Sequence, residues 1–484
     1  MKVSQEFLRR SGVLAVLLGA SAGCGDRSHA TLACAVEDMV GGENGVCVGV
    51  AEAAVCGVNR CTEGVSCANT IDVKDDGELE AAIASATAGT CISLSPGAYG
   101  PASLPGGVSL LGKSAADVAV EGVTLNEGVG AVVRGLTIGA GGLKISGATG
   151  AQVISVLIAD SAVEGINVAP GSAAKIISST VRGSSRYGLR VADGAAVTLD
   201  TSIIEGSEGP GIWSACSTAC AACTAPPKIS VTSSIIRDNH VGGVALFTTW
   251  ATLENVDIRR TKPGATWHSE MGGGGLSVMS CSNLVASSLR VHDSASYGVL
   301  VDGSSTNMSS ESAPDGDIDI RRNLMGVWVQ NVAAPQSVVL TRARIDGNKA
   351  VGVGTSGSTR GFIFRRSTVQ NTLLQAVPAE SGGSPIGSTM VGDGFVWRDN
   401  SSVTIEAIEF SNNARTSILV DGPAEGSISS LQLSGGDEQK GIVIQNVTGK
   451  DAKPDVDEGA APLNTSKYET FAIPTAPQRL DTAL

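Results

Sequence analysis

Apolar residues recur along most of this chain in pairs, with one residue between the two members of each pair. Such alternation sends one side chain inward and the next outward along a β-strand. Counted from a repeated Gly, the apolar positions fall at +1 and +3, near +9 and +11, and at +16. The pattern predicts three short strands in each repeat. Two successive repeats show it with Ile166, Val168, Ala174, Ile176 and Val181, then Leu189, Val191, Val197, Leu199 and Ile204.

The repeat has a constant length. Gly142, Gly165, Gly188 and Gly211 each lie 23 positions after the one before. A fixed period of this size indicates stacked units that share one continuous core. A leucine-rich repeat is excluded because its L-x-x-L-x-L phrase is missing, and a left-handed hexapeptide helix because no six-residue sub-period occurs. The phrase continues at Gly243, Gly275, Gly298, Gly326 and Gly352, degenerates to Gln375 and Ser417, and returns at Gly441.

A predicted helix precedes the repeats. Over residues 76–86 the apolar side chains fall on one helical face, and an alternating strand and a Pro-Gly-x-Tyr turn follow at residues 91–99. This order resembles the N-terminal cap of right-handed parallel β-helix proteins, the pectate-lyase-like superfold. The resemblance covers residues 70–447 and implies an all-β solenoid whose first coil is shielded by the helix. The predicted core-facing residues are Leu79, Ala82, Ile83 and Ala86.

Composition and charge limit the classes of partner that the chain is expected to bind. Gly makes up 62 of the 484 residues, far above the usual share of roughly 7%, which fits many tight turns around a slim core. The net charge of -13 disfavours nucleic acid as a partner, because phosphates reward Lys and Arg. It equally disfavours docking on anionic lipid by charge. An acidic polysaccharide is also unfavourable unless a divalent cation bridges the like charges.

The first residues are expected to direct export. A basic stretch with Arg9 and Arg10 leads into an apolar run at residues 13–18, and small residues follow. This order predicts a signal peptide at residues 1–23. The pair of arginines only faintly resembles a twin-arginine signal. Residues 20–22 read Ala-Ser-Ala, which fits ordinary cleavage and secretion.

A lipid anchor is the favoured alternative to plain secretion. Residues 21–24 resemble the lipobox of bacterial lipoproteins, except that Ser21 stands where Leu is usual. The resemblance implies lipidation of Cys24, a polar tether at residues 24–33, and, with Gly25 next, an outer-membrane location in the cell envelope. Contact with the membrane is then expected through the lipid alone.

The number of cysteines also supports lipidation of Cys24. Of the eleven Cys, a lipidated Cys24 leaves an even ten, which suits disulfides in an oxidising compartment. Residues 34–69 predict a small disulfide-stapled module, with Cys91 as a candidate to close it. A second group is expected to form two disulfides that tie a loop to a coil two turns on, with a four-cysteine metal site as the alternative. That group is Cys216, Cys220, Cys223 and Cys281.

Departures from the 23-residue period locate insertions. Residues 216–227, 304–314 and 379–393 all follow the same strand of their repeats in this numbering, so their loops are predicted to share one corner of the rod. A fourth insertion at residues 261–270 falls before its marker, at a different corner. Loops carry function disproportionately, so the shared corner is the predicted binding face. The tail, residues 448–484, loses the phrase and is expected to close or cross the far end.

Two further rows follow from the repeat. Position +2 is predicted to point outward, where Trp213 and Trp328 either stack a sugar or protein ligand or lie buried under loops. A row of Asn ahead of the markers suits tight corners, because Asn tolerates left-handed backbone. The outward row is Lys144, Asn167, Arg190, Trp213, Ala245, Ser277, Leu300, Trp328 and Gly354. The Asn row is Asn239, Asn323, Asn348, Asn371 and Asn413.

No catalytic, cofactor-binding or metal-binding residue is assigned. The stretch at residues 259–263 fails the R-x-P-x-x-R arrangement of pectate lyases, and the N-T-D and G-H-G phrases of polygalacturonases are absent. Two weaker groups are an acid–base candidate and an alternating row that resembles a calcium loop. The first is Arg259, Arg260, Lys262, His268 and Glu270, and the second is Asp315, Asp317 and Asp319. The four His are scattered.

The fold does not choose a function, because the superfold holds polysaccharide lyases, hydrolases and epimerases as well as adhesins and passenger rods. The first expectation is an exported, lipid-anchored rod without catalysis or cofactor that binds a polysaccharide or surface protein. The second is a polysaccharide-active lyase or hydrolase with a site near residues 259–270 or in the corner-loop groove.

Overall fold

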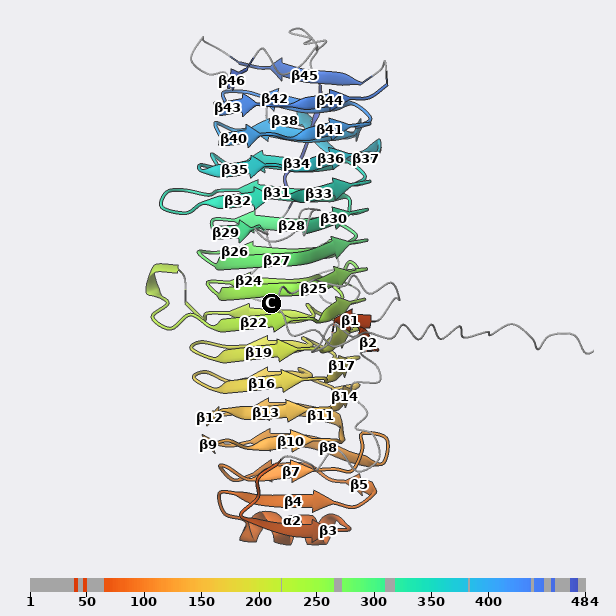
Figure 1. Cartoon of the computed structure of the whole chain (residues 1–484), viewed down its shortest axis with the longest axis vertical. Coiled ribbons are helices and arrows are strands. Elements are labelled where there is room, and N and C mark those ends of the chain that lie inside the picture. The colour runs from red at the N-terminus through yellow and green to blue at the C-terminus, as the bar shows by residue number, and fades with distance from the viewer. Residues whose placement is uncertain are drawn as a thin grey trace, which may run out of the picture.

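The chain forms a long rod of stacked coils in a computed structural model (Figure 1). The structure describes residues 39–41, 47–49, 65–218, 220–264, 272–309, 318–381, 384–436, 439–447, 454–457 and 471–477. Each complete coil contributes one strand to each of three parallel sheets, so the three predicted strands per repeat are confirmed. Cys24 and most of the predicted Cys-rich module lie outside the described residues.

The first sheet contains the strands that follow the marker glycines. It comprises β6 (Ala102–Leu104), the second halves of β8 (Val118–Leu125) and β11 (Thr137–Ile145), β15 (Ile166–Val168), β18 (Leu189–Val191), β21 (Ile212–Ala215), β24 (Gly242–Phe247), β26 (Gly274–Met279), β28 (Tyr297–Asp302), β31 (Met325–Gln330), β34 (Val351–Ser356), β39 (Asp393–Arg398), β42 (Thr416–Asp421) and β45 (Lys440–Gln445).

The second sheet follows after the next corner. It comprises β3 (Asn69–Val73), β4 (Thr90–Leu94), β7 (Ser109–Leu111), β10 (Val132–Arg134), β13 (Ala151–Ile154), β16 (Ala173–Ile177), β19 (Ala196–Asp200), β22 (Lys228–Thr232), the first halves of β25 (Trp250–Arg259) and β27 (Asn283–His292), β29 (Ser305–Met308), β32 (Val338–Thr341), β35 (Phe362–Arg365), β40 (Ser402–Glu406), β43 (Glu425–Ser429) and β46 (Asp455–Val456).

The third sheet completes each coil. It comprises β5 (Gly97–Tyr99), the first halves of β8 and β11, β14 (Leu157–Ala159), β17 (Thr180–Arg182), β20 (Ile203–Glu205), β23 (Ile235–Arg237), the second halves of β25 and β27, β30 (Ile318–Arg321), β33 (Ala343–Asp346), β36 (Thr368–Gln370), β41 (Glu409–Ser411) and β44 (Gln432–Ser434).

Smaller pairings lie outside these sheets. They are the antiparallel pair β1 (Met39–Gly41) and β2 (Cys47–Gly49), the short pair β9 (Gly128–Val129) and β12 (Ala148–Thr149), and the hairpin β37 (Gln375–Ser381) and β38 (Ser384–Val391) with β47 (Ile473–Pro474) at its edge. No helix among the described residues is long and apolar enough to cross a membrane.

Close packing explains the repeated glycines. A Cβ added to Gly298 would lie 2.7 Å from a methyl of Ile320 and 2.8 Å from the carbonyl oxygen of Gly326 on the next coil. Gly275 faces the same obstruction, 2.3 Å from a methyl of Val291. Because these contacts are with backbone and branched core side chains, no side chain fits there. The marker is therefore Gly for space at the corner between the third and first sheets.

The Asn row has the predicted structural role by a different mechanism. Asn323 is fully buried, accepts a hydrogen bond from the Ser294 amide at 2.9 Å and donates to the Val291 carbonyl at 3.2 Å, both on the preceding coil. Asn348 repeats this arrangement one coil on. The left-handed residue of the corner is the one before, such as Arg322 with φ 56°. Of the five Asn in the row, Asn371 alone has a left-handed backbone, with φ 56°.

The N-terminal cap is confirmed. Helix α2 (Asp76–Ser85) lies at the lower end of the rod in Figure 1, below β4. The Asp75 side chain accepts a hydrogen bond from the Glu78 amide at 2.9 Å, which satisfies a free donor of the first turn. Leu79 and Ala82 are buried against the first coil, and Ile83 packs against it in part. The polar side of α2 thus shields the apolar interior from water.

The prediction that three insertions share a corner is wrong. The loop after β21 lies between the first and second sheets as predicted, but the second insertion follows β29, between the second and third sheets. The third forms the hairpin β37–β38 ahead of β39, at the corner that also holds the fourth insertion. For the second insertion the sequence count overlooked β29, and for the third it took Gln375, which lies in the hairpin, as the marker. The true marker of that coil is Gly394, which packs against Gly352 below it.

The C-terminal segment turns back along the rod. Phe471 exchanges hydrogen bonds with the Gln445 side chain on β45, and the Ala472 carbonyl accepts a hydrogen bond from Arg415 at 2.9 Å. The Pro474 carbonyl then accepts one from Arg398, on β39, at 3.1 Å. The tail therefore crosses the outer face of the last first-sheet strands rather than simply ending the rod. Ile473 is buried there against Leu419 and Val443.

Candidate functional site

A disulfide-stapled loop projects from the corner between β21 and β22, as Figure 1 shows. Cys216 bonds Cys223 within the loop, and Cys220, in the short helix η1 (Cys220–Ala222), bonds Cys281 on the coil two turns on. The predicted disulfides are confirmed and the four-cysteine metal site is excluded. Because one disulfide closes the loop on itself and the other ties it to a second coil, it forms a ridge between the outer faces of the first and second sheets.

On the first-sheet side, the outward row is confirmed and its tryptophans are buried. Backbone pairing puts Arg190 beside Trp213, and Leu300 beside Trp328. Trp213 is only 4% exposed because it stacks on Tyr187, with ring centres 5.3 Å apart, and packs on Phe247. Trp328 is fully buried. These two rings therefore belong to a second apolar cluster outside the coil interior.

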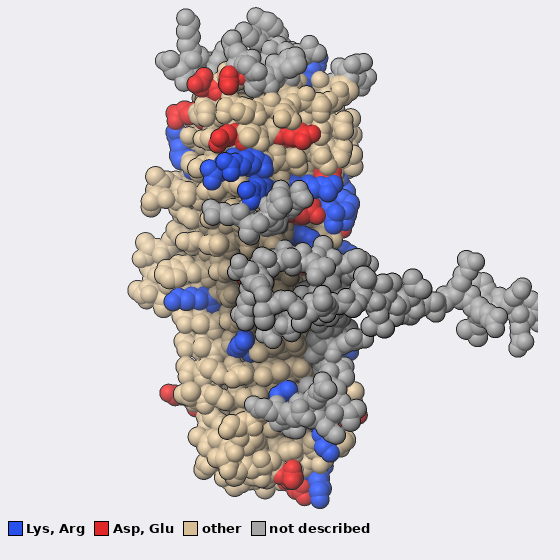
Figure 2. Space-filling model, viewed as in Figure 1, with Lys and Arg blue, Asp and Glu red and all other residues tan. Residues whose placement is uncertain are grey.

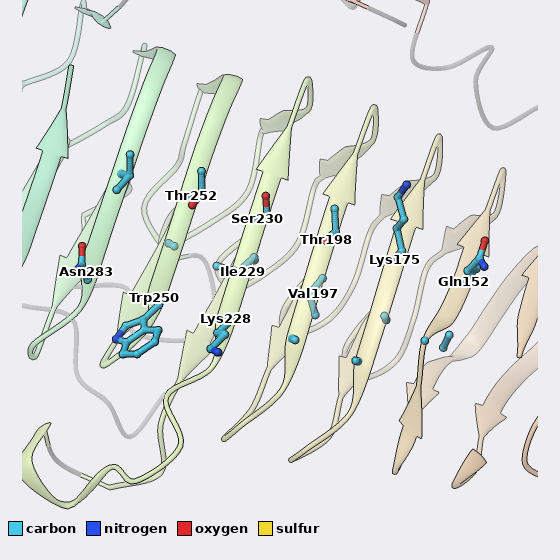
Figure 3. A pocket seen from close by; sticks show the side chains of 17 residues that line it. Gln152, Lys175, Val197, Thr198, Lys228, Ile229, Ser230, Trp250, Thr252 and Asn283 are labelled. Carbon is cyan, nitrogen blue, oxygen red and sulfur yellow. The ribbon is translucent and has the colours of Figure 1, made fainter. Parts of the chain in front are cut away.

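On the second-sheet side lies an open trough with a volume of about 840 Å³. Its base is a ladder of outward side chains held in register by parallel pairing, one on each successive coil (Figure 3). Strands in such a stack lie about 4.8 Å apart. The trough thus offers hydrogen-bonding groups at a regular spacing along the rod. The ladder is Gln152, Lys175, Thr198, Ser230 and Thr252.

A second ladder at the strand starts gives the trough its wall. Ala173 and Ala196 are small, whereas Lys228 and Trp250 rise above them on the next two coils. Trp250 is 53% exposed, and the Lys228 ammonium lies 5.3 Å from the centre of a Trp250 ring. Figure 3 shows both side chains at the end of the strands where the stapled loop lies. An exposed indole next to a fixed ridge is a ready surface for stacking.

The trough has no acid–base pair. Among the described residues that line it, the charged ones are Lys175 and Lys228, and none is Asp or Glu. The described lining therefore supplies no carboxylate and no His for general acid–base chemistry. In Figure 2 most of the visible face of the rod is uncharged, and the charged side chains gather mainly over the upper coils.

The described residues of the acid–base group that the sequence suggested form separate ion pairs at the third sheet. The Arg260 guanidinium pairs with both carboxylate oxygens of Asp238, at 3.0 and 2.7 Å, and Lys262 lies 3.9 Å from the same group. Arg259 is 5% exposed and pairs with Asp257 at 3.4 Å. His268 and Glu270 lie outside the described residues. The described members of this group do not line the trough.

The structure instead brings His292 to this cluster, which the scattered His of the sequence did not indicate. Its Nε2 lies 3.0 Å from Asp257 and its Nδ1 lies 2.7 Å from Asp293. Burial raises the pKa of the Asp257 carboxyl, but the hydrogen bond to His292 and the charge of Arg259 outweigh it and hold that pKa below its usual value. The carboxylates are therefore ionised and occupied by partners.

The calcium-like row is not assembled by the described residues. Asp315 and Asp317 lie outside them, and Asp319 pairs with Arg321 at 3.5 Å. No group of three or more His, Cys, Asp or Glu suited to a metal occurs in the described part of the chain.

Trp250 was missed as a site residue, although the alternation contained the signal. Trp250, Thr252 and Glu254 point outward from β25, while Ala251 and Leu253 are buried. Extending the inward–outward count from the marker strand to the next strand would have put this Trp on the surface. Its exposure, however, depends on no loop folding over it, which no local pattern shows.

Comparison with known proteins agrees with the architecture. Residues 164–313 match the family model described as "Right handed beta helix region". No curated protein matches the chain. Similar solved structures include pectate lyase Pel9A (13% identity, TM-score 0.38, covering 63% of this chain and 80% of that one). Another is the A-module of the Azotobacter vinelandii mannuronan C-5 epimerase AlgE4 (13% identity, TM-score 0.36, covering 84% of this chain and 98% of that one). A third is the catalytic unit of a Streptomyces thermodiastaticus GH87 α-1,3-glucanase (13% identity, TM-score 0.39, covering 91% of this chain and 73% of that one).

Proposed function

We propose that this right-handed parallel β-helix protein is an exported rod that binds a polysaccharide chain, without catalysis, in the second-sheet trough. The observation that carries the proposal is Trp250, a residue that is 53% exposed at the wall of a regular polar ladder. An extended sugar chain offers flat apolar ring faces for the indole and hydroxyl groups for the ladder. The ridge and the sheet are rigid, so little freedom is lost when the chain binds.

The geometry also suits a polymer better than a small ligand. The ladder runs across five successive coils, and its groups are amide, ammonium and hydroxyl. Each contact is weak because water competes for it, so a repeating ligand gains affinity by making several in a row. The stapled loop bounds the trough beside Trp250 and limits the paths that a chain can take.

Binding is tested with Trp250→Ala against a panel of neutral and acidic glycans. We expect the variant to bind at least about tenfold more weakly, because a central exposed aromatic side chain carries much of the energy of such a surface. Affinity by calorimetry is the measurement. Leu374→Ala is the matched control, since Leu374 is 51% exposed but does not line the trough. If Trp250→Ala bound the glycan with unchanged affinity, the proposed site would be contradicted.

The same panel tests the enzymatic alternative. Each glycan is incubated with the protein, with and without Ca²⁺, and examined for unsaturated or reducing ends. Turnover would replace the binding function by that of a polysaccharide lyase or hydrolase. Because the Asp257–His292–Asp293 cluster is the described group with acid–base chemistry, His292→Ala would then be the first variant to examine.

Export and anchoring form a separate part of the proposal. The apolar run at residues 13–18 followed by Cys24 supports a lipoprotein signal, with the rod held at the outer membrane by lipid alone. Cys24→Ala should release the protein from the membrane fraction of its host. Continued membrane association of that variant would contradict the anchor without affecting the binding site.

A further inference from the structure

A second cavity, of about 910 Å³, lies across the stapled loop from the trough. Its floor includes the stacked rings of Tyr187 and Trp213 and the ring of Phe247, which is tilted against Trp213. The loop supplies its wall with Cys216 and Ser217. A volume near this value is within the range of roughly 300–1,000 Å³ that small-molecule sites occupy. The disulfides hold the wall in place, so the cavity does not have to be assembled when a ligand enters.

The carboxylates around this cavity are already occupied. Asp193 accepts hydrogen bonds from the backbone amide of Ser217, at 2.7 Å, and from its hydroxyl. Asp302 accepts from the side-chain amides of Gln330 and Asn331, at 3.2 and 3.0 Å. Neutral donors therefore engage these carboxylate oxygens and use them to anchor the loop and the neighbouring turn.

The cationic side of the cavity is different. Arg186 pairs with Glu164 at 3.4 Å and lies over the Tyr187 ring. Arg190 is partly buried on β18, between Asn167 and Trp213 in the outward row, and pairs with no carboxylate of the described chain. Its guanidinium therefore keeps the capacity to make charge-assisted hydrogen bonds to an anion in the cavity.

We propose that this cavity binds a compact organic anion, a carboxylate or phosphate monoester on an apolar ring. Its charged group pairs with Arg190, and its apolar body lies against the aromatic floor and the Cys216–Cys223 disulfide. The site is independent of the trough, because the ridge separates the two and no residue lines both.

The probes test separately what the charged group and the apolar ring of the ligand contribute to binding. They are benzoate, cyclohexanecarboxylate and phenyl phosphate, with benzyl alcohol as the uncharged probe and inorganic phosphate as the anion without a body. Binding to the full-length protein is measured by calorimetry. We expect at least one ring-bearing anion to bind and benzyl alcohol to bind far more weakly. Carboxylates and phosphate monoesters are distinguished by which of the first three binds best.

Variants assign the site. Arg190→Gln should weaken binding of that anion at least about tenfold, since it removes a charge-assisted contact but keeps the shape of the side chain. Arg190→Lys should retain part of the affinity. Arg182→Gln is the control, because Arg182 is exposed on the third sheet away from the cavity. Thermal unfolding of each variant verifies that the fold is intact.

Three results would overturn the assignment. They are no binding by any ring-bearing anion, equal binding by the wild type and Arg190→Gln, and a preference for inorganic phosphate over every ring-bearing probe. Trp250→Ala should leave this binding unchanged, and that result distinguishes failure here from failure of the glycan proposal.

Discussion

At the scale of single residues, ion pairs on the third sheet hold several carboxylates in the ionised form. Asp293 accepts hydrogen bonds from Arg322, at 2.8 and 2.7 Å, and from His292, at 2.7 Å. The Arg322 guanidinium, with His292 adding to it, lowers the pKa of the Asp293 carboxyl to about 2. The unfolded chain binds a proton near the ordinary Asp pKa of about 3.9.

Because the folded pKa is lowered, Asp293 stabilises the fold above pH of about 3.9, and this contribution is lost as the pH falls toward 2. Removing Arg322 should reduce that dependence. We therefore expect Arg322→Gln to flatten the decrease in the free energy of unfolding between these pH values, compared with the wild type. Denaturant unfolding at several pH values is the measurement. Arg342→Gln, on the neighbouring coil, is a control, and an unchanged pH slope in Arg322→Gln would contradict the assignment.

At the scale of elements, the loop between β21 and β22 owes its position to covalent bonds. Within residues 216–223 the only regular structure described is one 3₁₀ turn, so little backbone hydrogen bonding holds the loop. The Cys220–Cys281 bond spans 61 residues, and closing a loop of this length restricts the unfolded chain by an amount on the order of 4 kcal/mol. The bond therefore stabilises the coils between as well as the ridge.

Replacing both partners of this bond tests that role. We expect the variant Cys220→Ser with Cys281→Ser to unfold at a lower temperature, because the unfolded chain regains conformational freedom. The loss of the ridge should also weaken ligand binding at both the trough and the cavity. Calorimetric unfolding and binding are the measurements. Reduction of the wild type should have at least the same effect, and a variant with the wild-type midpoint would show that the staple is dispensable.

At the scale of the whole molecule, the ends of the rod are protected differently. Helix α2 covers the first coil, whereas the tail covers the outer face of the last coils through Phe471 and Ile473. Ile473 is 2% exposed and packs on Leu419 and Val443, which point away from the coil interior. Without the tail, this apolar row would face water, and exposed apolar surface promotes association.

Ile473→Ala should therefore destabilise the C-terminal coils by about 2–5 kcal/mol, the usual cost of truncating a buried Ile. Deletion of residues 471–484 should further cause association that grows with protein concentration. Unfolding and sedimentation velocity are the measurements. Val285→Ala, at a residue that is 49% exposed, is the control. A deletion variant that stays monomeric and equally stable would show that the tail does not protect the rod.

Local periodicity was enough for the architecture. The 23-residue spacing and the inward–outward alternation predicted three strands per coil and the outward row from Lys144 to Gly354, and both agree with the structure. The helical spacing of apolar residues over 76–86 predicted the N-terminal helix, which the structure also has. These features depend on side-chain direction along a strand, which the order of residues contains. The number of cysteines likewise indicated disulfides at the ridge, because disulfides use thiols in pairs, and the structure has two there.

The tertiary structure decided where the rod is covered and where it is open. Trp213 and Trp328 occupy equivalent outward positions and are buried, whereas Trp250 is exposed on another sheet, because exposure depends on which segments pack over each face. In the sequence, Gln375 falls where a marker glycine is expected. Only strand pairing showed that Gly394 is the marker of that coil. The sequence by itself determined the stacked coils, since their period is local. The tertiary structure alone decided the trough, the unpaired Arg190 and the returning tail, since these depend on contacts between residues far apart in the chain.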